Sequence, residues 1–193
     1  MRATMAKYKL EENVMAEEKK EAWLNYLALT TVIFAVCATL STFKGGGFST
    51  RSVMSQSQAS DQWAYFQAKG IKAYLYQLQA EKLEMELLVL PKSSSNEVEA
   101  TYKEKIATYK KMVDKYEKEK SEIQEKAKQL EGVRDESQLH SKAFGVAVIY
   151  LQIAILLSSI AGLLKKKVVW YGGIATGLVG LFYFADGFLV FLP

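Results

Sequence analysis

Few residues could carry out chemistry, because the chain of 193 residues has one histidine and one cysteine. His140 has no cysteine or second histidine to complete a metal site, so we interpret it as a polar residue at a membrane boundary; the alternative is a proton-handling role. Cys37 lies in an apolar run and is interpreted as a small packing residue. The segment "KGGGFSTR" at 44–51 lacks the G-x-x-x-x-G-K-[ST] spacing of a phosphate-binding loop. We therefore predict no catalytic, cofactor or metal site and expect no enzyme.

Asp186 is the one ionisable residue within an otherwise apolar run near the C-terminus. An acid inside a membrane span is energetically costly and by default indicates a site that handles ions or protons. The alternative is a salt bridge at the membrane boundary, and Lys44 and Lys142 lie at a suitable depth to form it. Gln152, near the centre of another apolar run, also needs a polar partner. These four residues are the predicted intramembrane polar candidates.

Three apolar runs must position these residues. Segments 22–43 and 143–164 carry no charge, and segment 168–192 carries only Asp186. Each run reaches the roughly 20 apolar residues that a helix needs to cross about 30 Å of hydrocarbon. The sequence therefore predicts an all-α membrane protein with three transmembrane helices. The remaining segments are a charged N-terminal stretch at 1–21, a long polar region at 44–142 and a basic loop at 165–167.

The net charge of +4 comes from lysines that flank the predicted spans and not from a basic surface. The sequence therefore predicts a lipid bilayer as a partner and no nucleic acid. The short basic loop 165–167 is expected to stay in the cytoplasm, because lysine-rich short loops do so. The N-terminus is then cytoplasmic, and the region 44–142 and the C-terminus lie on the opposite side.

The region 44–142 is predicted to form an antiparallel coiled-coil hairpin inserted between the first and second spans, with its turn near 91–96. Apolar residues recur with a period of 3.5 on both sides of Pro91, as in a coiled coil. Gly45–Gly47 are predicted to break the helix after the first span, and Ser49 or Thr50 to cap the next one. The predicted seam residues are Ala64, Ala68, Ile71, Leu75, Leu78, Met85 and Val89 before the turn, and Tyr102, Ile106, Tyr109, Val113, Tyr116, Ile123, Ala127 and Leu130 after it.

Small residues recur on one face of two predicted spans, and such faces let transmembrane helices approach closely. They are Ala28, Thr31, Ala35, Ala38 and Thr42 in the first span, and Gly173, Gly177 and Gly180 in the third. Packing within the chain or between copies would both use them. Trp63, Tyr65 and Phe66 are predicted to bury against another helix, which we expect to belong to a neighbouring subunit. Tyr102, Tyr109 and Tyr116 are interpreted as seam residues of the hairpin.

The stretch from Trp23 to Lys72, "WLNYLALTTVIFAVCATLSTFKGGGFSTRSVMSQSQASDQWAYFQAKGIK", resembles the bacterial membrane family known as domain of unknown function 4337. The resemblance continues through the three-span layout. It implies a small protein of the bacterial inner membrane. The orientation predicted from the basic loop then makes the hairpin and the C-terminus periplasmic. It supplies no catalytic or binding residues.

Two functional hypotheses follow from these features. The first is a non-enzymatic membrane protein that forms a homo-oligomer and projects the hairpin as a scaffold or interaction stalk, with a protein partner at the hairpin as a further possibility. The second is an oligomeric ion channel or proton-coupled unit that uses Asp186. The three-span layout is similar to that of proton-driven motor subunits, but in those the long insert is cytoplasmic.

Overall fold

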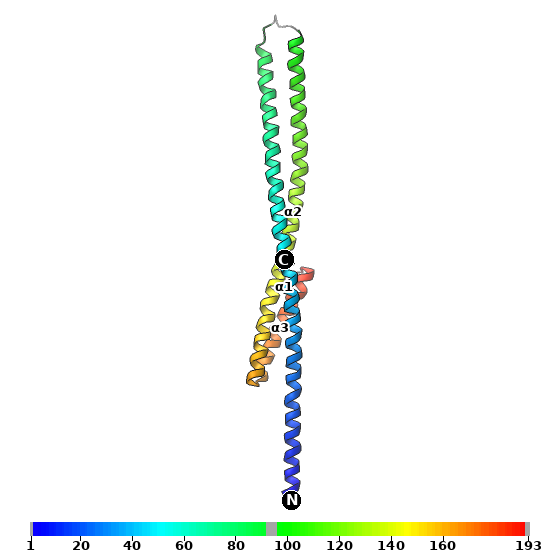
Figure 1. Cartoon of the computed structure of the whole chain (residues 1–193), viewed down its shortest axis with the longest axis vertical. Helices are drawn as coiled ribbons and strands as arrows, with labels where there is room; N and C mark the ends of the chain where they lie inside the picture. The colour runs from blue at the N-terminus through cyan, green and yellow to red at the C-terminus, as the bar shows by residue number, and fades with distance from the viewer. Residues whose placement is uncertain (1, 92–95, 192–193) are drawn as a thin grey trace. The chain divides into compact units, whose positions relative to one another are not determined.

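The computed structural model is entirely helical over the residues that it describes, 2–91 and 96–191, with side chains described from residue 23 onward. The helices are α1 (Arg2–Val89), α2 (Asn96–Leu164) and α3 (Lys167–Leu189) (Figure 1). All three are long and apolar enough to cross a membrane. The first two each contain a predicted span and a predicted hairpin arm in one continuous helix. The hairpin is therefore not a separately inserted element, and residues 92–95 of its predicted turn near 91–96 lie outside the described residues.

The glycine run does not interrupt α1, so the predicted helix break at Gly45–Gly47 is wrong. Thr50 does not cap a new helix, because its hydroxyl donates to the Gly46 carbonyl oxygen one turn earlier at 3.0 Å. Glycine in a helix interior costs only about 1 kcal/mol relative to alanine, and long helical segments on both sides offset that cost. Gly45 instead permits a close contact: a Cβ there would lie 2.9 Å from the Cβ of Phe144.

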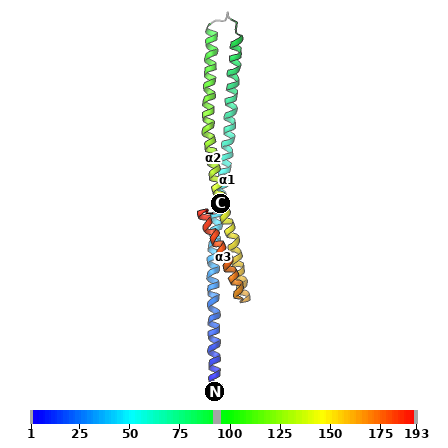
Figure 2. The same ribbon diagram turned by 180° about the vertical axis from the view of Figure 1, so that it is seen from behind.

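Contacts divide the chain into a three-helix unit, Met1–Arg51 with Glu136–Pro193, and a hairpin unit, Ser52–Asp135. In the three-helix unit α3 lies beside parts of α1 and α2 in both views (Figures 1 and 2). The core of this unit contains Phe34 and Ala38 of α1 with Leu151 and Ala154 of α2. Three buried glycines of α3 face it: Gly173 at Ala154, Gly177 at Phe34 and Gly180 at Leu151.

A tight turn joins α2 to α3 at Lys165 and Lys166. Lys165 has a positive φ of 55°, and the Lys166 amide donates to the carbonyl oxygen of Ala161 at 3.2 Å. The predicted basic loop 165–167 is therefore shorter than expected, because Lys167 already begins α3. Its ammonium group lies 5.9 Å from the ring centroid of Trp23, which ties this end of α3 to α1.

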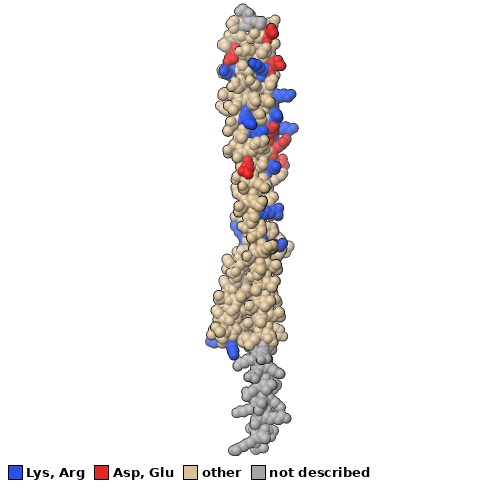
Figure 3. Space-filling view, in the orientation of Figure 1, with Lys and Arg blue, Asp and Glu red and all other residues tan. Residues whose placement is uncertain are grey.

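The two units differ in the charge of their surfaces. In the face drawn in Figure 3, charged side chains gather over the hairpin unit, and the three-helix unit shows them only near its edges. The three-helix unit instead exposes large apolar side chains on its outside, among them Leu29, Val36, Leu156 and Phe182. In water such a surface would be unfavourable, since contiguous apolar patches are rare on soluble monomers.

The hairpin unit pairs α1 with α2 in antiparallel fashion. The pairing is fixed by contacts that run in opposite directions along the two helices: Gln56 with Arg134, Trp63 with Glu131, Lys69 with Glu119 and Glu84 with Lys110. On α2 the predicted seam residues are buried or half-buried, with Ile106, Ile123 and Ala127 the most buried. The predicted seam of this arm therefore agrees with the structure.

On α1 the predicted seam is wrong. Ile71, Leu75 and Met85 are 62%, 53% and 62% exposed, and the buried residues at heptad spacing are alanines. These are Ala59, Ala73 and Ala80. The reason is that two apolar stripes of α1 share the 3.5-residue period, and the stripe that faces α2 combines these alanines with larger half-buried residues such as Phe66 and Tyr76. The predicted stripe faces outward.

The α3 glycines give the first testable prediction. A Cβ at Gly177 would overlap the Phe34 ring, whereas a Cβ at Gly172, in the same helix, would meet nothing within 4 Å. Gly177→Ala should destabilise the three-helix unit by about 1–3 kcal/mol, a typical cost of overpacking. Thermal melts of helical circular dichroism in detergent would measure it. Gly172→Ala is the matched control and should be neutral or slightly stabilising; equal melting temperatures for the two variants would contradict the contact.

Candidate functional site

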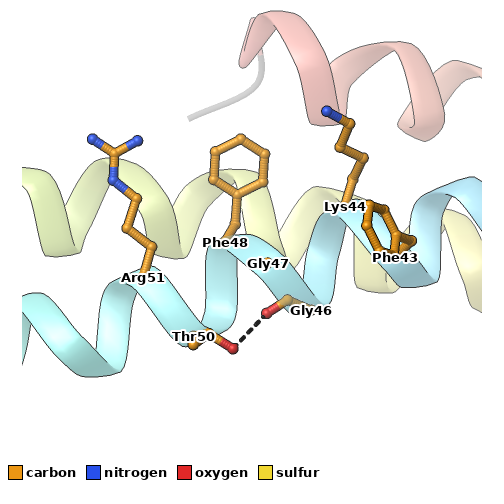
Figure 4. Close-up of a pocket in the computed structure, with 7 residues that line it drawn as sticks. All are labelled: Phe43, Lys44, Gly46, Gly47, Phe48, Thr50 and Arg51. Carbon is orange, nitrogen blue, oxygen red and sulfur yellow. Dashed lines mark hydrogen bonds between the residues drawn. The ribbon is translucent and has the colours of Figure 1, made fainter.

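The buried carboxylate of Asp186 lies at the C-terminal end of α3, where it is 2% exposed. Its Oδ1 accepts the Phe191 amide at 3.0 Å, and its carbonyl oxygen accepts the Val190 amide at 2.7 Å. Val190 adopts a left-handed conformation with φ of 46°, as is common where helices end. Asp186 therefore satisfies backbone donors at the end of α3. Within the described ranges neither predicted partner, Lys44 or Lys142, forms an ion pair, although Lys44 extends from α1 toward this end of α3 (Figure 4).

His140 of α2 contacts both α1 and α3 near the C-terminal end of α3. Its Nδ1 lies 2.8 Å from the carbonyl oxygen of Gly187 in α3, which assigns the ring proton to Nδ1 if the contact is a hydrogen bond. Its ring stacks on Phe48 of α1 with centroids 4.4 Å apart. Next to it, the Ser141 hydroxyl donates to the Gly45 carbonyl oxygen at 3.2 Å. This role could not be predicted from the sequence, because a lone histidine has no spacing from which a partner can be inferred.

A hollow of about 380 Å³ lies on the surface of α1 beside this contact (Figure 4). We call it the glycine hollow; it is lined by Phe43, Lys44, Gly46, Gly47, Phe48, Thr50 and Arg51. Lys44, Phe48 and Arg51 point to one side of the helix, and Gly46 and Thr50 lie on the other. A Cβ at Gly46 or Gly47 would meet nothing within 4 Å. No contact within the described part of the chain explains these two glycines.

The hairpin seam contains one charged layer. Lys69 of α1 pairs with Glu119 of α2 at 2.5 Å, and the Lys69 ammonium group lies 5.1 Å from the ring centroids of both Tyr65 and Tyr116. The hydrogen bond from Lys69 holds the pKa of Glu119 below its ordinary value, and the same hydrogen bond raises the pKa of Lys69. Both shifts favour the charged pair.

The predicted aromatic residues contact the hairpin's own helices. The Trp63 indole donates to Glu131 at 2.9 Å and its ring meets that of Phe66 at 5.5 Å. Tyr109 and Tyr116 each lie 5.7 Å from Tyr76 of α1, a seam residue that the sequence analysis missed. Of the remaining predicted aromatic residues, Tyr102 has its hydroxyl 3.3 Å from the Glu86 carboxylate. Tyr65 is half exposed.

The small-residue face of the first span is only partly used within the chain. Ala38 is buried, Thr31 and Ala35 are half-buried, and Ala28 and Thr42 are exposed. A groove of about 320 Å³ runs beside Ala35 on the outer side of α1. Gln152 of α2 also faces outward, in the middle of its apolar run. These exposed positions are available for contacts between copies.

A second apolar stripe runs along α1 in the hairpin unit. We call it the outer stripe; it comprises Ala64, Ala68, Ile71, Leu75, Leu78, Met85 and Val89, with Lys82 at one position. Each member follows an inner seam position by two residues, which places the stripe about 200° around the helix, opposite α2. By contrast, described residues 99–138 of α2 expose no large apolar side chain.

No three His, Cys, Asp or Glu side chains come together to hold a metal ion in the described part of the chain. Comparison with protein families gives one match: the model of a domain of unknown function, DUF4337, covers residues 23–190. No curated protein and no solved structure matches the chain.

The Lys69–Glu119 pair predicts how the hairpin responds to pH. The folded pKa of Glu119 lies below its ordinary value of 4.5, so its ionised form stabilises the hairpin above that value. This stability is lost as the pH falls through the lower folded value. Lys69 stays charged throughout this window, because its pKa is raised. Between about pH 6 and pH 3, the melting temperature should fall more for the wild type than for Glu119→Gln.

Circular dichroism melts of the full chain in detergent would measure this difference. Glu122→Gln provides the control, because Glu122 is an exposed acid of the same helix with no ion pair among the described residues. It should keep the wild-type pH dependence. A Glu119→Gln variant with an unchanged pH dependence would show that the pair contributes nothing.

Proposed function

We propose a function from the chain's own geometry, because the chain belongs to the DUF4337 family, whose description assigns no activity. It is a non-enzymatic membrane scaffold: the three-helix unit anchors it, and the hairpin unit binds the hairpin of a second copy. The observation that carries this proposal is the outer stripe, an apolar heptad face that the chain itself leaves uncovered.

Membrane anchoring is supported by the surface of the three-helix unit. Its three helices are long and apolar enough to span a bilayer, and large apolar side chains cover its outside. Trp23 and Trp170, whose ring centroids lie 6.2 Å apart, together with Tyr26 and Tyr171, fit an aromatic belt at one membrane face. The adjoining basic loop supports a location of this face on the cytoplasmic side of a bacterial inner membrane. The hairpin and the C-terminus are then periplasmic.

Self-association is supported by the length and period of the outer stripe. It extends from residue 64 to residue 89, between three and four heptads, and apolar heptads sustained over three to four repeats favour a coiled coil. The outward face of α2 is charged, so the matching surface on a second copy is the same stripe. Such a self-complementary contact has two-fold symmetry. Anchoring in one membrane makes the two α1 helices parallel and raises their effective concentration.

The charged position of the stripe also fits a parallel pair. Lys82 lies beside Glu81 and Glu86, and its ammonium group is 3.8 Å from Glu86 within its own helix. In a parallel coiled coil, flanking acids of one helix reach across toward the other. The lysines at this layer are then surrounded by carboxylates from both copies. A charged residue at a core position lowers stability but fixes the register of the pair.

The scaffold is favoured over the alternative ion channel by the position of Asp186. Its carboxylate accepts a backbone amide where α3 ends. An acid in this place has a structural use that requires no ion path. The exposed amide of Gln152 adds to the case for association, because a polar side chain that faces lipid gains by bonding to a neighbouring helix.

Cysteine crosslinking tests the pairing of the outer stripes. Leu78→Cys in a Cys37→Ala background should give a disulfide-linked dimer upon mild oxidation in membranes. The reason is that facing core positions of a parallel pair lie within the roughly 4.4–6.8 Å Cα separation that a disulfide needs. Gel electrophoresis without reductant would measure the dimer.

Lys111→Cys in the same background is the matched control, because Lys111 is exposed on the charged face of α2. It should remain monomeric. In addition, Leu75→Glu with Leu78→Glu should convert the detergent-solubilised dimer to monomer, since each buried leucine contributes about 1.5–3 kcal/mol. Equal crosslinking at positions 78 and 111 would refute the proposed interface.

Reporter fusions test the orientation. Alkaline phosphatase fused at Ser94 or after the C-terminus should be active, because both positions are proposed to be periplasmic. A cytoplasmic fluorescent reporter at the same positions should be inactive. An active cytoplasmic reporter at Ser94 would reverse the orientation and favour a layout like that of proton-driven motor subunits.

A further inference from the structure

We propose that the glycine hollow binds the phosphate group of an acidic phospholipid. The inference rests on the proposed membrane location and adds a ligand to it. The hollow lies where the uncharged run 22–43 ends and Lys44, the first basic residue after it, follows. At that depth a spanning helix leaves the hydrocarbon and meets the layer of lipid headgroups.

The two outer glycines carry the first part of the argument. Gly45 has a packing reason, since a Cβ there would lie 2.9 Å from Phe144. Gly46 and Gly47 have none, because a Cβ at either would meet open space. Each still carries the cost of about 1 kcal/mol of a glycine in a helix interior. Gly46 lies on the side away from the basic residues. Gly47 falls between Lys44 and Arg51 on one helix face, at i+3 from the first, and therefore leaves room beside both for a group from outside the chain.

The basic residues that border the hollow indicate which chemical group it binds. Lys44 and Arg51 border the hollow, and neither forms an ion pair with a described residue. No acid occurs between residues 22 and 60, so the local sequence offers them no counter-charge. Arginine binds phosphate oxygens through two parallel hydrogen bonds, and lysine adds a point charge. A phosphate therefore satisfies both groups.

The remaining lining fits a lipid better than a free phosphate ion. Lys44 and Arg51 are seven residues apart, about 10 Å along the helix axis, which suits a headgroup with its glycerol backbone. Phe43, which is 77% exposed, and Phe48 supply apolar surface at the hollow. Figure 4 shows the Phe48 ring standing between the two basic side chains. Apolar and basic groups together match the boundary between acyl chain and headgroup.

The test uses the full chain in neutral detergent, titrated with phosphatidylglycerol or phosphatidylcholine and followed by native mass spectrometry. Each basic residue near an anionic lipid contributes about fivefold to binding. We therefore expect phosphatidylglycerol to bind at least about tenfold more tightly, and Lys44→Gln with Arg51→Gln to abolish this preference. Lys165→Gln with Lys166→Gln, the same charge change in the basic turn, should keep it.

A second variant separates a shaped site from general charge attraction. Gly47→Leu fills the hollow, leaves both basic residues in place and raises helix propensity, so it should fold and lose most of the preference. A fully retained preference in Gly47→Leu would overturn the site in the hollow. Equal loss in the Lys165/Lys166 control would also overturn it. If inorganic phosphate at millimolar concentration displaces the lipid completely, the site belongs to free phosphate and the lipid assignment fails.

Alkaline carbonate extraction of membranes distinguishes failure of this inference from failure of the proposed function. A chain that resists extraction but shows no preference for phosphatidylglycerol refutes the lipid site alone. A chain that carbonate releases refutes the membrane anchor, and with it both proposals.

Discussion

Close approach of helices at residues with little or no side chain is the constraint on which both units depend. In the three-helix unit, glycines of α3 receive Phe34 of α1 and Leu151 of α2, and Gly45 of α1 receives Phe144. In the hairpin unit, Ala59, Ala73 and Ala80 of α1 and Ala127 of α2 are buried where the two helices pair. In both units small residues allow the helices to approach closely.

On α1 the buried alanines and the outer stripe lie on opposite sides of the helix, so Ile71, Leu75 and Met85 face outward. In the three-helix unit the outward apolar residues would face lipid under the proposed anchoring. In the hairpin unit another helix that covered the exposed heptads would remove their apolar surface from water, which is favourable. The packing of the monomer therefore supports the proposed pairing with a second copy.

The helices could be predicted from the sequence, but the buried face could be predicted for α2 and not for α1. Helical content, the three apolar runs and the α2 seam followed from composition and from the 3.5-residue period. The α1 seam could not be chosen in the same way, because two stripes share that period and lie on opposite sides of the helix. Size suggested Ile71 and Leu75, whereas the stripe that faces α2 contains Ala73 and Ala80. Which stripe is inside depends on a helix far away in the sequence.

The role of each glycine in the run 45–47 likewise depends on residues that are distant in the sequence. A run of three glycines predicts a break only if nothing supports the helix, and here helix continues on both sides. Within that run the glycines differ in their surroundings. Gly45 packs closely against Phe144, whereas a Cβ at Gly46 or Gly47 would meet no described atom within 4 Å. A glycine without a packing partner in the chain lowers the stability of the helix and allows no close contact within the chain. The proposed lipid site gives Gly47 a role that does not depend on packing within the chain, and sequence alone could not have distinguished Gly47 from Gly45.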